Sequence, residues 1–267
     1  MHISINNFSL AYDERGAGQS VLLIHGYPLS RRLWAPQVDV LSSSARIIAP
    51  DLRGHGDSDP VPGPYNVDML ADDCAALLDA LGVTRPVVVC GLSMGGYVTF
   101  AFYRRHPQRV AGLVLAATRA AADSPEGKAA RQKAMQTARE SGPQAIAAGM
   151  LPKMFAPDIY QRQPELLETA RAMMEGTSLN GVLGDLAALM ERPDSTPTLS
   201  TIRVPTLVIH GDSDQIIPVS EAQGMAAAIP GARLAVLPNT GHLLNMEQPE
   251  KFNEAVQSFL RSLVRKR

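Results

Sequence analysis

Apolar residues gather in six short runs along the chain, most of them bounded by Gly or Pro. The runs are VLLIHG (21–26), ARIIAP (45–50), PVVVCG (86–91), VAGLVLAA (110–117), VPTLVIHG (204–211) and ARLAVLP (232–238). Near-continuous runs of this kind, rather than alternating ones, are typical of strands that are covered on both faces. The pattern therefore predicts six buried strands.

Between these runs, apolar positions recur at three- and four-residue spacing, which predicts amphipathic helices. The predicted helices cover residues 66–82, 94–106, 219–228 and 247–264. Strands that alternate with helices favour a parallel, doubly wound sheet. The chain is therefore assigned to the α/β class.

One interval, residues 120–199, interrupts this alternation. It contains no strand-like run and is rich in Ala, Met, Gln and Glu, with breaks at Gly-Pro, Ala-Pro and Arg-Pro pairs. The interval is too long for an ordinary loop and too helical for a linker. We therefore expect a helical cap here, inserted into a core domain formed by residues 1–119 and 200–267.

Length and charge narrow the class of protein. The chain has 267 residues, enough for one large domain with its own core, and its formal net charge is −1. Nucleic acid is therefore not an expected partner, because no basic field would attract phosphates. The only cysteines are Cys74 and Cys90, and we expect both to be buried thiols rather than a disulfide framework.

No targeting or membrane segment is evident. The start, MHISINNFSL, lacks a cationic segment followed by an apolar stretch, and no run approaches the roughly 18 apolar residues of a membrane helix. We expect a cytoplasmic protein without a membrane partner. The basic end of the chain, LVRKR (263–267), is expected to be solvated. Whether the chain is a monomer or a homo-oligomer stays open.

The stretch GLSMGGY (91–97) lies between a predicted strand and a predicted helix. A G-x-S-x-G pattern at such a junction is typical of a nucleophile elbow, a sharp turn that presents the serine side chain. Glycine is needed two residues before and two residues after the serine, because the strand and helix pack closely there. The pattern predicts Ser93 as a catalytic nucleophile.

A serine hydroxyl needs a general base, and the base needs an orienting carboxylate. In this kind of sheet the expected chain order is serine, acid, histidine. Of the six histidines, only His242, in NTGHLLN, follows a credible loop carboxylate. The loop GDSDQIIP offers Asp212 and Asp214; Asp214 is favoured because Asp212 directly follows Gly211 and could simply cap the turn.

An acyl-transfer site also needs hydrogen-bond donors for the oxyanion. We expect one from the backbone N–H of Met94, the residue after the nucleophile, and the second from the backbone N–H of Tyr27 in the loop His25-Gly26-Tyr27-Pro28. His25 itself is expected to hydrogen-bond this loop. Candidate pocket residues are Trp34, for which core packing is equally reasonable, and Leu243. No cluster has the spacing of a zinc site and no Gly-rich loop carries a Lys for phosphate.

With these residues assigned, the chain resembles the α/β-hydrolase superfamily over nearly its whole length. The resemblance rests on HGYPLSRRLW, APDLRGHGDSD, GLSMGGY, GDSDQIIP and GHLLNMEQPE in this order. Within the superfamily it is similar to small bacterial carboxylesterases, including an esterase from a thermophilic planctomycete, and to the 3-oxoadipate enol-lactonases. The resemblance implies a mostly parallel eight-stranded sheet flanked by helices, and a hydrogen-bonded network of Asp51, Arg53 and His55 beneath the oxyanion loop.

The resemblance also implies hydrolysis of small-molecule esters with short acyl groups through an acyl-enzyme, without a cofactor. Serine at position 93 disfavours the dehalogenases and epoxide hydrolases of this fold, which use aspartate as nucleophile. Lactonase or perhydrolase action would use the same three residues and stays open. So does a small-molecule receptor on the same fold. A charged diacid substrate would require cationic groups facing the pocket, and sequence alone does not place the cap's arginines and lysines.

Overall fold

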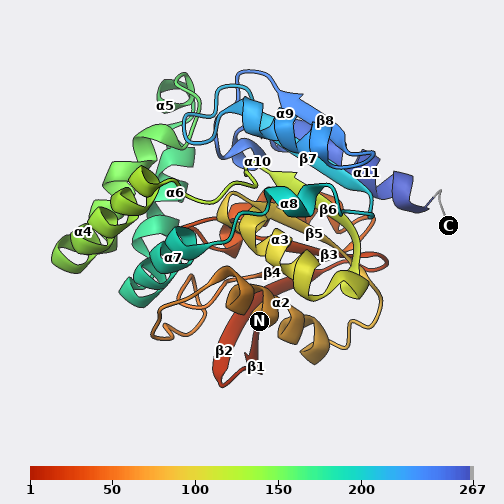
Figure 1. The fold of residues 1–267 in the computed structure, drawn as a ribbon, viewed down its shortest axis with the longest axis horizontal. Helices are drawn as coiled ribbons and strands as arrows, with labels where there is room; N and C mark the ends of the chain where they lie inside the picture. Colours follow the sequence, from red (N-terminus) through yellow and green to blue (C-terminus); the bar gives the residue numbers. More distant parts are fainter. Residues whose placement is uncertain (265–267) are drawn as a thin grey trace.

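The computed structural model describes residues 1–264, which fold around one sheet of eight strands (Figure 1). The strands are β1 (His2–Ile5), β2 (Phe8–Arg15), β3 (Ser20–Ile24), β4 (Arg46–Pro50), β5 (Val87–Leu92), β6 (Val110–Ala116), β7 (Thr206–Gly211) and β8 (Arg233–Leu237). Their order across the sheet is β1-β2-β4-β3-β5-β6-β7-β8. β2 pairs antiparallel with β1 and β4, and the pairs from β4 to β8 are parallel. The predicted mostly parallel, eight-stranded sheet is confirmed.

The six predicted strands correspond to β3 through β8, within two residues at each end. The sequence pattern did not reveal the β1–β2 hairpin, because β1 is partly exposed and the apolar residues of both strands are interrupted by polar ones instead of forming a continuous run. Asn6 and Asn7 form its turn with φ of 45° and 66°. Two consecutive residues with positive φ are typical of the tight hairpin turn that Asn favours. The Asn-Asn pair was therefore the available signal.

Alternate residues of the central strands pack into two separate cores, one on each face of the sheet. Leu22 and Ile24 of β3 belong to one core, and Val21 and Leu23 belong to the other. The first core is covered by α2 (Val67–Ala80), α3 (Met94–Arg105) and α9 (Val219–Ala228); the second is covered by α1 (Ala35–Leu41), α10 (Leu244–Glu247) and α11 (Pro249–Val264). Cys74 and Cys90 are buried free thiols, as expected.

The structure differs from the helix predictions in two places. Helix α1 was not predicted, because it is only 7 residues long and begins with Ala-Pro. The helix predicted over 247–264 is divided: α10 ends at Glu247, Gln248 has a non-helical φ of −133°, and α11 begins at Pro249. The residue before a proline is biased away from the helical region, which explains the break.

The helices α4 (Pro125–Met150), α5 (Ile159–Arg162), α6 (Pro164–Glu175), α7 (Leu179–Glu191) and α8 (Thr196–Leu199) lie between β6 and β7 in the chain. They occupy the interval for which the cap is predicted, and α4 to α7 gather at one side of the sheet (Figure 1). Helix α4 is kinked where Gly142, with φ 74°, precedes Pro143. The cap segments contact the loops that follow the parallel strands, for example through a hydrogen bond from Leu243 N to Met154 O.

Within residues 1–264, no helix has both the length and the apolar character needed to cross a membrane. The same residues hold no cluster of three or more His, Cys, Asp or Glu side chains arranged for a metal ion. Residues 265–267 of the basic chain end, which the sequence predicts to be solvated, lie outside the described residues.

Candidate active site

Ser93 occupies the turn between β5 and α3, with φ 56° and ψ −114°. A positive φ is unfavourable for a residue with a Cβ, so the surroundings must hold it in place. Glycines on both sides make the turn possible. A Cβ on Gly91 would lie 2.1 Å from Gly95 O, and a Cβ on Gly95 would lie 2.2 Å from Ile24 O. The structure therefore confirms that Gly91 and Gly95 leave no room for a side chain, as the sequence indicated.

His242 follows β8 and Asp214 follows β7, so both lie at the same edge of the sheet as Ser93. Nδ1 of His242 lies 2.7 Å from Oδ2 of Asp214. Because a carboxylate only accepts hydrogen bonds, Nδ1 must carry the proton, and Nε2 is left free to accept one. Ser93 and His242 line one cavity. The fold thus brings together three residues that are far apart in the sequence.

The Asp214 carboxylate is buried and held by several donors. The amides of Ile216 and Ile217 donate to its Oδ1 at 2.8 and 3.0 Å, and Nε2 of His210 lies 3.3 Å from its Oδ2. Burial by itself would raise the pKa of Asp214, but the charge of His242 and the hydrogen bonds from the two histidines and Ile217 hold that pKa well below its usual range. Asp214 therefore stays ionised. His210, which the sequence analysis set aside, contributes by supporting this carboxylate.

Asp212, the alternative acid, has a different environment. Its Oδ1 accepts hydrogen bonds from Ser213 Oγ at 2.8 Å and from Thr240 N at 3.4 Å. The bond from Ser213 stays within the loop, and the bond from Thr240 joins the start of the loop to the segment after β8. This position corresponds to the turn-capping role that the sequence analysis gave as its alternative interpretation.

Backbone amides from two elements approach Ser93. Met94 is the first residue of α3, so its N–H has no partner within the helix. Tyr27 follows Gly26, and a Cβ on Gly26 would lie only 3.2 Å from Ser93 Cβ. Glycine at residue 26 therefore allows the loop after β3 to approach the serine without displacing a neighbour. Tyr27 and Met94 both line the cavity that contains Ser93.

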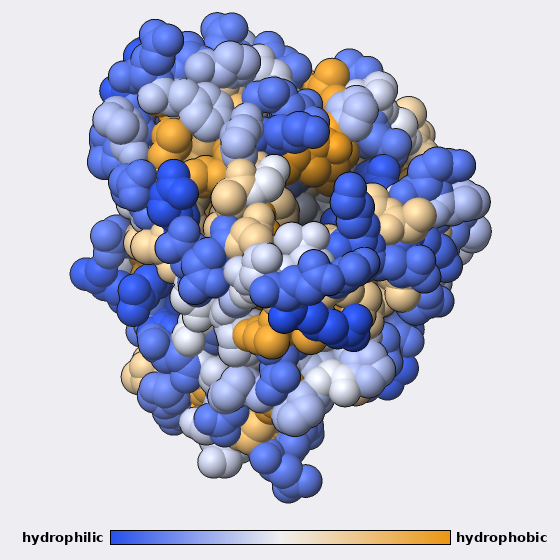
Figure 2. Space-filling view, turned by 90° about the vertical axis from the view of Figure 1, so that its left-hand side faces the viewer, coloured by the Kyte–Doolittle hydropathy of each residue, from blue (hydrophilic) through white to orange (hydrophobic). Residues whose placement is uncertain are grey.

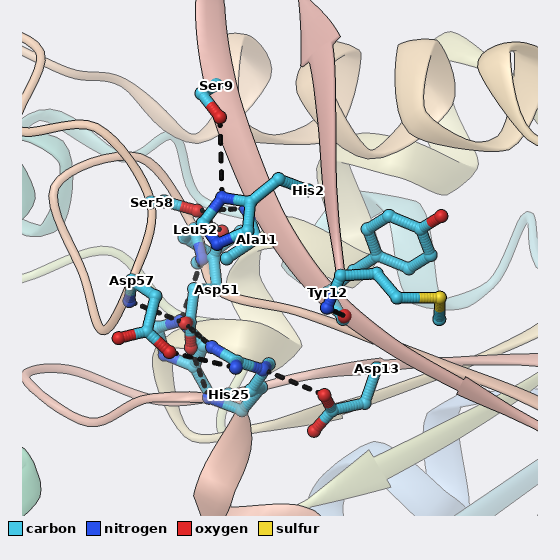
Figure 3. Close-up of polar contacts among 12 residues, drawn as sticks. His2, Ser9, Ala11, Tyr12, Asp13, His25, Asp51, Leu52, Asp57 and Ser58 are labelled. Atoms are coloured by element: carbon cyan, nitrogen blue, oxygen red, sulfur yellow. Dashed lines mark hydrogen bonds and ion pairs between the residues drawn. The ribbon is translucent and has the colours of Figure 1, made fainter.

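A buried hydrogen-bond network holds the loop of Tyr27 (Figure 3). Leu52 N donates to Nε2 of His25 at 3.0 Å, so the proton of His25 is on Nδ1, which donates to Gly26 O at 2.9 Å. Burial, together with the nearby His55, lowers the pKa of His25 to about 3 and keeps the ring neutral. Asp51 accepts hydrogen bonds from the backbone and side chain of Arg31 and from Asp57 N. The expected bonding of His25 to its own loop is confirmed.

The cavity at Ser93 is small, with a volume of about 80 Å³. Its lining residues come from the core loops and from the cap: Tyr27, Ser93, Met94, Tyr97, Arg119, Arg131, Met150, Leu189, Ile216, Ile217 and His242. Two candidate pocket residues are not among them. Trp34 is fully buried and packs on Phe252 of α11 at a ring distance of 5.9 Å, and Leu243 is fully buried in the same core. Both side chains contribute to packing instead.

A family model described as the alpha/beta hydrolase fold matches residues 19–249 of the chain. The chain belongs to the α/β-hydrolase family. The 3-oxoadipate enol-lactonase 2 of Acinetobacter baylyi is 32% identical over 261 residues, which cover 97% of this chain and 96% of that protein.

Two solved structures of α/β-hydrolases are similar over nearly the whole chain. A thermophilic esterase from Thermogutta terrifontis, solved with malate bound, is 40% identical with a TM-score of 0.96 and covers 98% of this chain and 99% of its own. The enol-lactonase from Burkholderia xenovorans LB400 is 32% identical with a TM-score of 0.91. The match covers 98% of this chain and 100% of that enol-lactonase. These similarities confirm the alpha/beta hydrolase fold, and the similar proteins include an esterase and enol-lactonases.

Two arginines of this α/β-hydrolase line the cavity without having been assigned there from the sequence. Arg119 lies three residues beyond the end of β6, and Arg131 lies in the first half of α4. Arg131 was one of several cap cations that the sequence left unplaced. A residue shortly after the carboxyl end of a parallel strand is a usual site position, which could have drawn attention to Arg119.

The cap is attached to the loop after β4 by a buried pair that the sequence also did not indicate. Nε2 of His55 lies 3.0 Å from Oδ2 of Asp185 on α7, and neither side chain is exposed. Nδ1 of His55 donates to Arg53 O at 3.0 Å. Burial opposes a charged His55, but the Asp185 carboxylate raises its pKa, and burial raises the pKa of Asp185. The pair therefore forms a buried electrostatic contact between α7 and the loop after β4.

Glu247 is a second unforeseen buried carboxylate. Its oxygens accept hydrogen bonds from Gly241 N at 2.9 and 3.0 Å and from Ala156 N at 3.2 Å. Gly241 is the neighbour of His242, and Ala156 belongs to the cap. Burial raises the pKa of Glu247 to about 7, although these two amides oppose the increase. Glu247 thus joins the histidine loop to the cap.

Proposed function

We propose that this α/β-hydrolase is a serine carboxylesterase that hydrolyses short-acyl carboxylic esters through an acyl-enzyme. The observation that carries the proposal is the 2.7 Å hydrogen bond between His242 and Asp214 beside a cavity shared with Ser93. The orientation of His242, with its proton on Nδ1, suits a general base for the serine hydroxyl. The 80 Å³ volume of the cavity favours a short acyl group.

In the proposed first step, Nε2 of His242 takes the proton of Ser93 while the serine oxygen attacks the ester carbonyl carbon. The amides of Tyr27 and Met94 donate to the oxyanion that forms. When the tetrahedral intermediate collapses, His242 gives its proton to the departing alcohol. Ser93 then carries the acyl group as an ester.

In the second step, His242 removes a proton from water, which attacks the acyl-enzyme. The same two amides stabilise the second oxyanion, and His242 returns the proton to Ser93 as the acid is released. Asp214 remains ionised and holds the ring in one tautomer throughout. Both proposed steps use only groups of the protein, the ester substrate and water.

A lactonase is the second candidate, because its chemistry would use the same residues on a cyclic ester. Arg119 and Arg131 at the cavity favour it, since they could receive a charged lactone. The similarity to enol-lactonases over nearly the whole chain is consistent with this alternative. Relative kcat/KM values for open-chain esters and lactones separate the two candidates.

The test is a p-nitrophenyl ester series of increasing acyl length, run beside a lactone panel. The wild-type enzyme should turn over the acetyl and propionyl esters repeatedly, and Ser93→Ala should abolish this activity. Asp214→Asn should lower kcat by about 10⁴-fold, because an amide no longer fixes the productive tautomer. Asp212→Asn is the matched control and should stay within a few-fold of wild type.

Equal losses in the two aspartate variants would contradict the assignment of Asp214. A preference for lactones by orders of magnitude in kcat/KM would favour the second candidate. A single turnover that stops at the acylated protein would instead point to a small-molecule receptor.

A further inference from the structure

Two guanidinium groups share the small cavity with Ser93 and His242. Arg119 and Arg131 are its only cationic lining residues from the described part of the chain, and the remaining lining is largely apolar or aromatic. A cavity of about 80 Å³ has room for roughly three water-sized groups. Any substrate that reaches Ser93 must therefore come close to both arginines.

A buried carboxylate, Asp123, positions these arginines. Its oxygens lie 2.7 Å from Nη2 of Arg119, 3.1 Å from Nε of Arg131 and 2.8 Å from Nη2 of Arg192. Three guanidinium groups thus share one carboxylate, and the cluster retains positive charge. An excess of buried or half-buried cations is unfavourable unless an anion joins them.

The contacts of the Arg192 side chain are with other groups of the protein. Its side chain is 2% exposed, donates to Leu189 O and Ala121 O, and lies 4.2 Å from the centre of the Tyr97 ring. Arg119 and Arg131 are 28% and 30% exposed and each uses one nitrogen on Asp123. Because a guanidinium has five N–H donors, both retain donors for a ligand at the cavity.

The hydroxyl of Tyr27 adds a third donor. Tyr27 is 5% exposed and lines the same cavity, and its hydroxyl has no hydrogen-bond partner within residues 1–264. A buried hydroxyl is rarely left without a partner in a folded protein. A ligand oxygen in the cavity would satisfy it.

A larger groove of about 500 Å³ adjoins the cavity and shares Tyr27, Arg131, Met150 and Ile216 with it. Its lining adds Lys133 and Lys153 to Arg131 and is otherwise mainly apolar. Figure 2 faces the side where the cap helices lie and shows apolar residues recessed between hydrophilic ones. The approach to Ser93 is therefore also positively charged.

From these contacts we infer that the preferred ester substrate carries a free carboxylate, which Arg119 and Arg131 bind while Ser93 attacks the ester group. The inference rests on the proposed function of Ser93 as nucleophile. Arginine suits a carboxylate because its planar N–H groups match the two oxygens. The carboxylate can belong to the acyl part or to the alcohol part of the ester, and paired substrates distinguish the two.

The experiment compares each charged ester with a neutral analogue of similar shape. Monomethyl succinate against methyl butyrate tests the acyl side, and 4-acetoxybenzoate against 4-acetoxybenzamide tests the alcohol side. We expect the wild-type enzyme to prefer the charged member of at least one pair by about 10- to 100-fold in kcat/KM, the range of a charged hydrogen-bonded contact.

Arg119→Gln and Arg131→Gln should each remove most of this preference, measured as the ratio of kcat/KM within each ester pair. Labelling of Ser93 by diethyl p-nitrophenyl phosphate reports independently that the variants are folded and that Ser93 still acts. Arg131→Lys should retain part of the preference. Arg139→Gln, an exposed arginine on the same helix α4, is the matched control and should leave the preference unchanged.

Binding of succinate, measured by titration calorimetry, separates this inference from the proposed function. Succinate binding that Arg131→Gln weakens at least tenfold, without ester hydrolysis, would overturn the esterase and leave the carboxylate site standing. Hydrolysis of neutral esters with no charge preference and no succinate binding would overturn the carboxylate site. A preference that survives both glutamine substitutions would overturn the assignment to these arginines.

Discussion

The partners of individual ring nitrogens determine where the protons lie in the candidate site. The amide of Leu52 can only donate, so it fixes the neutral Nδ1–H form of His25. The Asp214 carboxylate can only accept, so it fixes the same tautomer in His242. The two rings have different roles because one has both nitrogens occupied by backbone groups and the other keeps Nε2 beside the cavity.

Glu247 gives a pH dependence that can be measured on the stability of the protein. Its pKa is about 7 in the folded state, against an ordinary value of 4.5. The folded protein therefore binds this proton more tightly than the unfolded chain, and the contribution of Glu247 to stability falls as the pH rises from about 4.5 to about 7. Relative to Glu247→Gln, the wild type should lose up to about 3 kcal/mol over this range.

Urea unfolding of both proteins at several pH values between 4.5 and 8 measures this difference. The exposed Glu254 on α11 supplies the control variant Glu254→Gln, whose difference from wild type should vary little with pH. A pH-independent difference for Glu247→Gln would contradict the raised pKa.

At the scale of elements, the sequence predicted the strands and helices that carry a regular apolar pattern. It did not predict features that depend on contacts between distant parts of the chain. Runs of Val, Ile and Leu predict β3 to β7 because both faces of these strands are largely buried. The run of β8 is also apolar, but Leu234 and Val236 are exposed, so the expected burial of this strand is wrong. The hairpin β1–β2 and the helix α1 carry weaker patterns, since one is partly exposed and the other is short. The pairing of His55 with Asp185 on α7 could not be predicted, because it depends on how the cap helices pack on the core.

Helix α7 approaches the loop after β4 so closely that only glycine fits. A Cβ on Gly181 would lie 2.3 Å from Gly54 O, and Ser178 donates to the same oxygen through its N at 3.1 Å and its Oγ at 2.8 Å. Gly181→Ala should therefore displace α7 and lower the free energy of unfolding by about 1–3 kcal/mol.

Gly224→Ala in α9 is the matched control, because a Cβ there meets no atom within 4 Å. It should be neutral or should stabilise the protein by up to about 1 kcal/mol, since alanine favours the helix more than glycine does. Chemical unfolding measures both. An equal effect of the two substitutions would contradict the close packing of α7 on Gly54.

Across the whole molecule, the parallel sheet explains why residues from distant parts of the chain meet. Tyr27, Ser93, Arg119, Asp214 and His242 each follow a parallel strand, and loops after the carboxyl ends of parallel strands lie at one edge. The order of serine, acid and histidine was readable from the sequence for this reason. The position of Arg119 and Arg131 at the cavity was not predicted from the sequence, because it depends on their contacts with Asp123 and on the position of α4.

The most direct test of the central claim is covalent labelling of Ser93 by diethyl p-nitrophenyl phosphate, followed by peptide mass mapping. We predict one phosphoryl adduct per chain, located on Ser93, with esterase activity lost in proportion to labelling. Ser93→Ala should take up no adduct. Full activity after complete labelling of Ser93, or inactivation by an adduct elsewhere while Ser93 stays unmodified, would contradict the account.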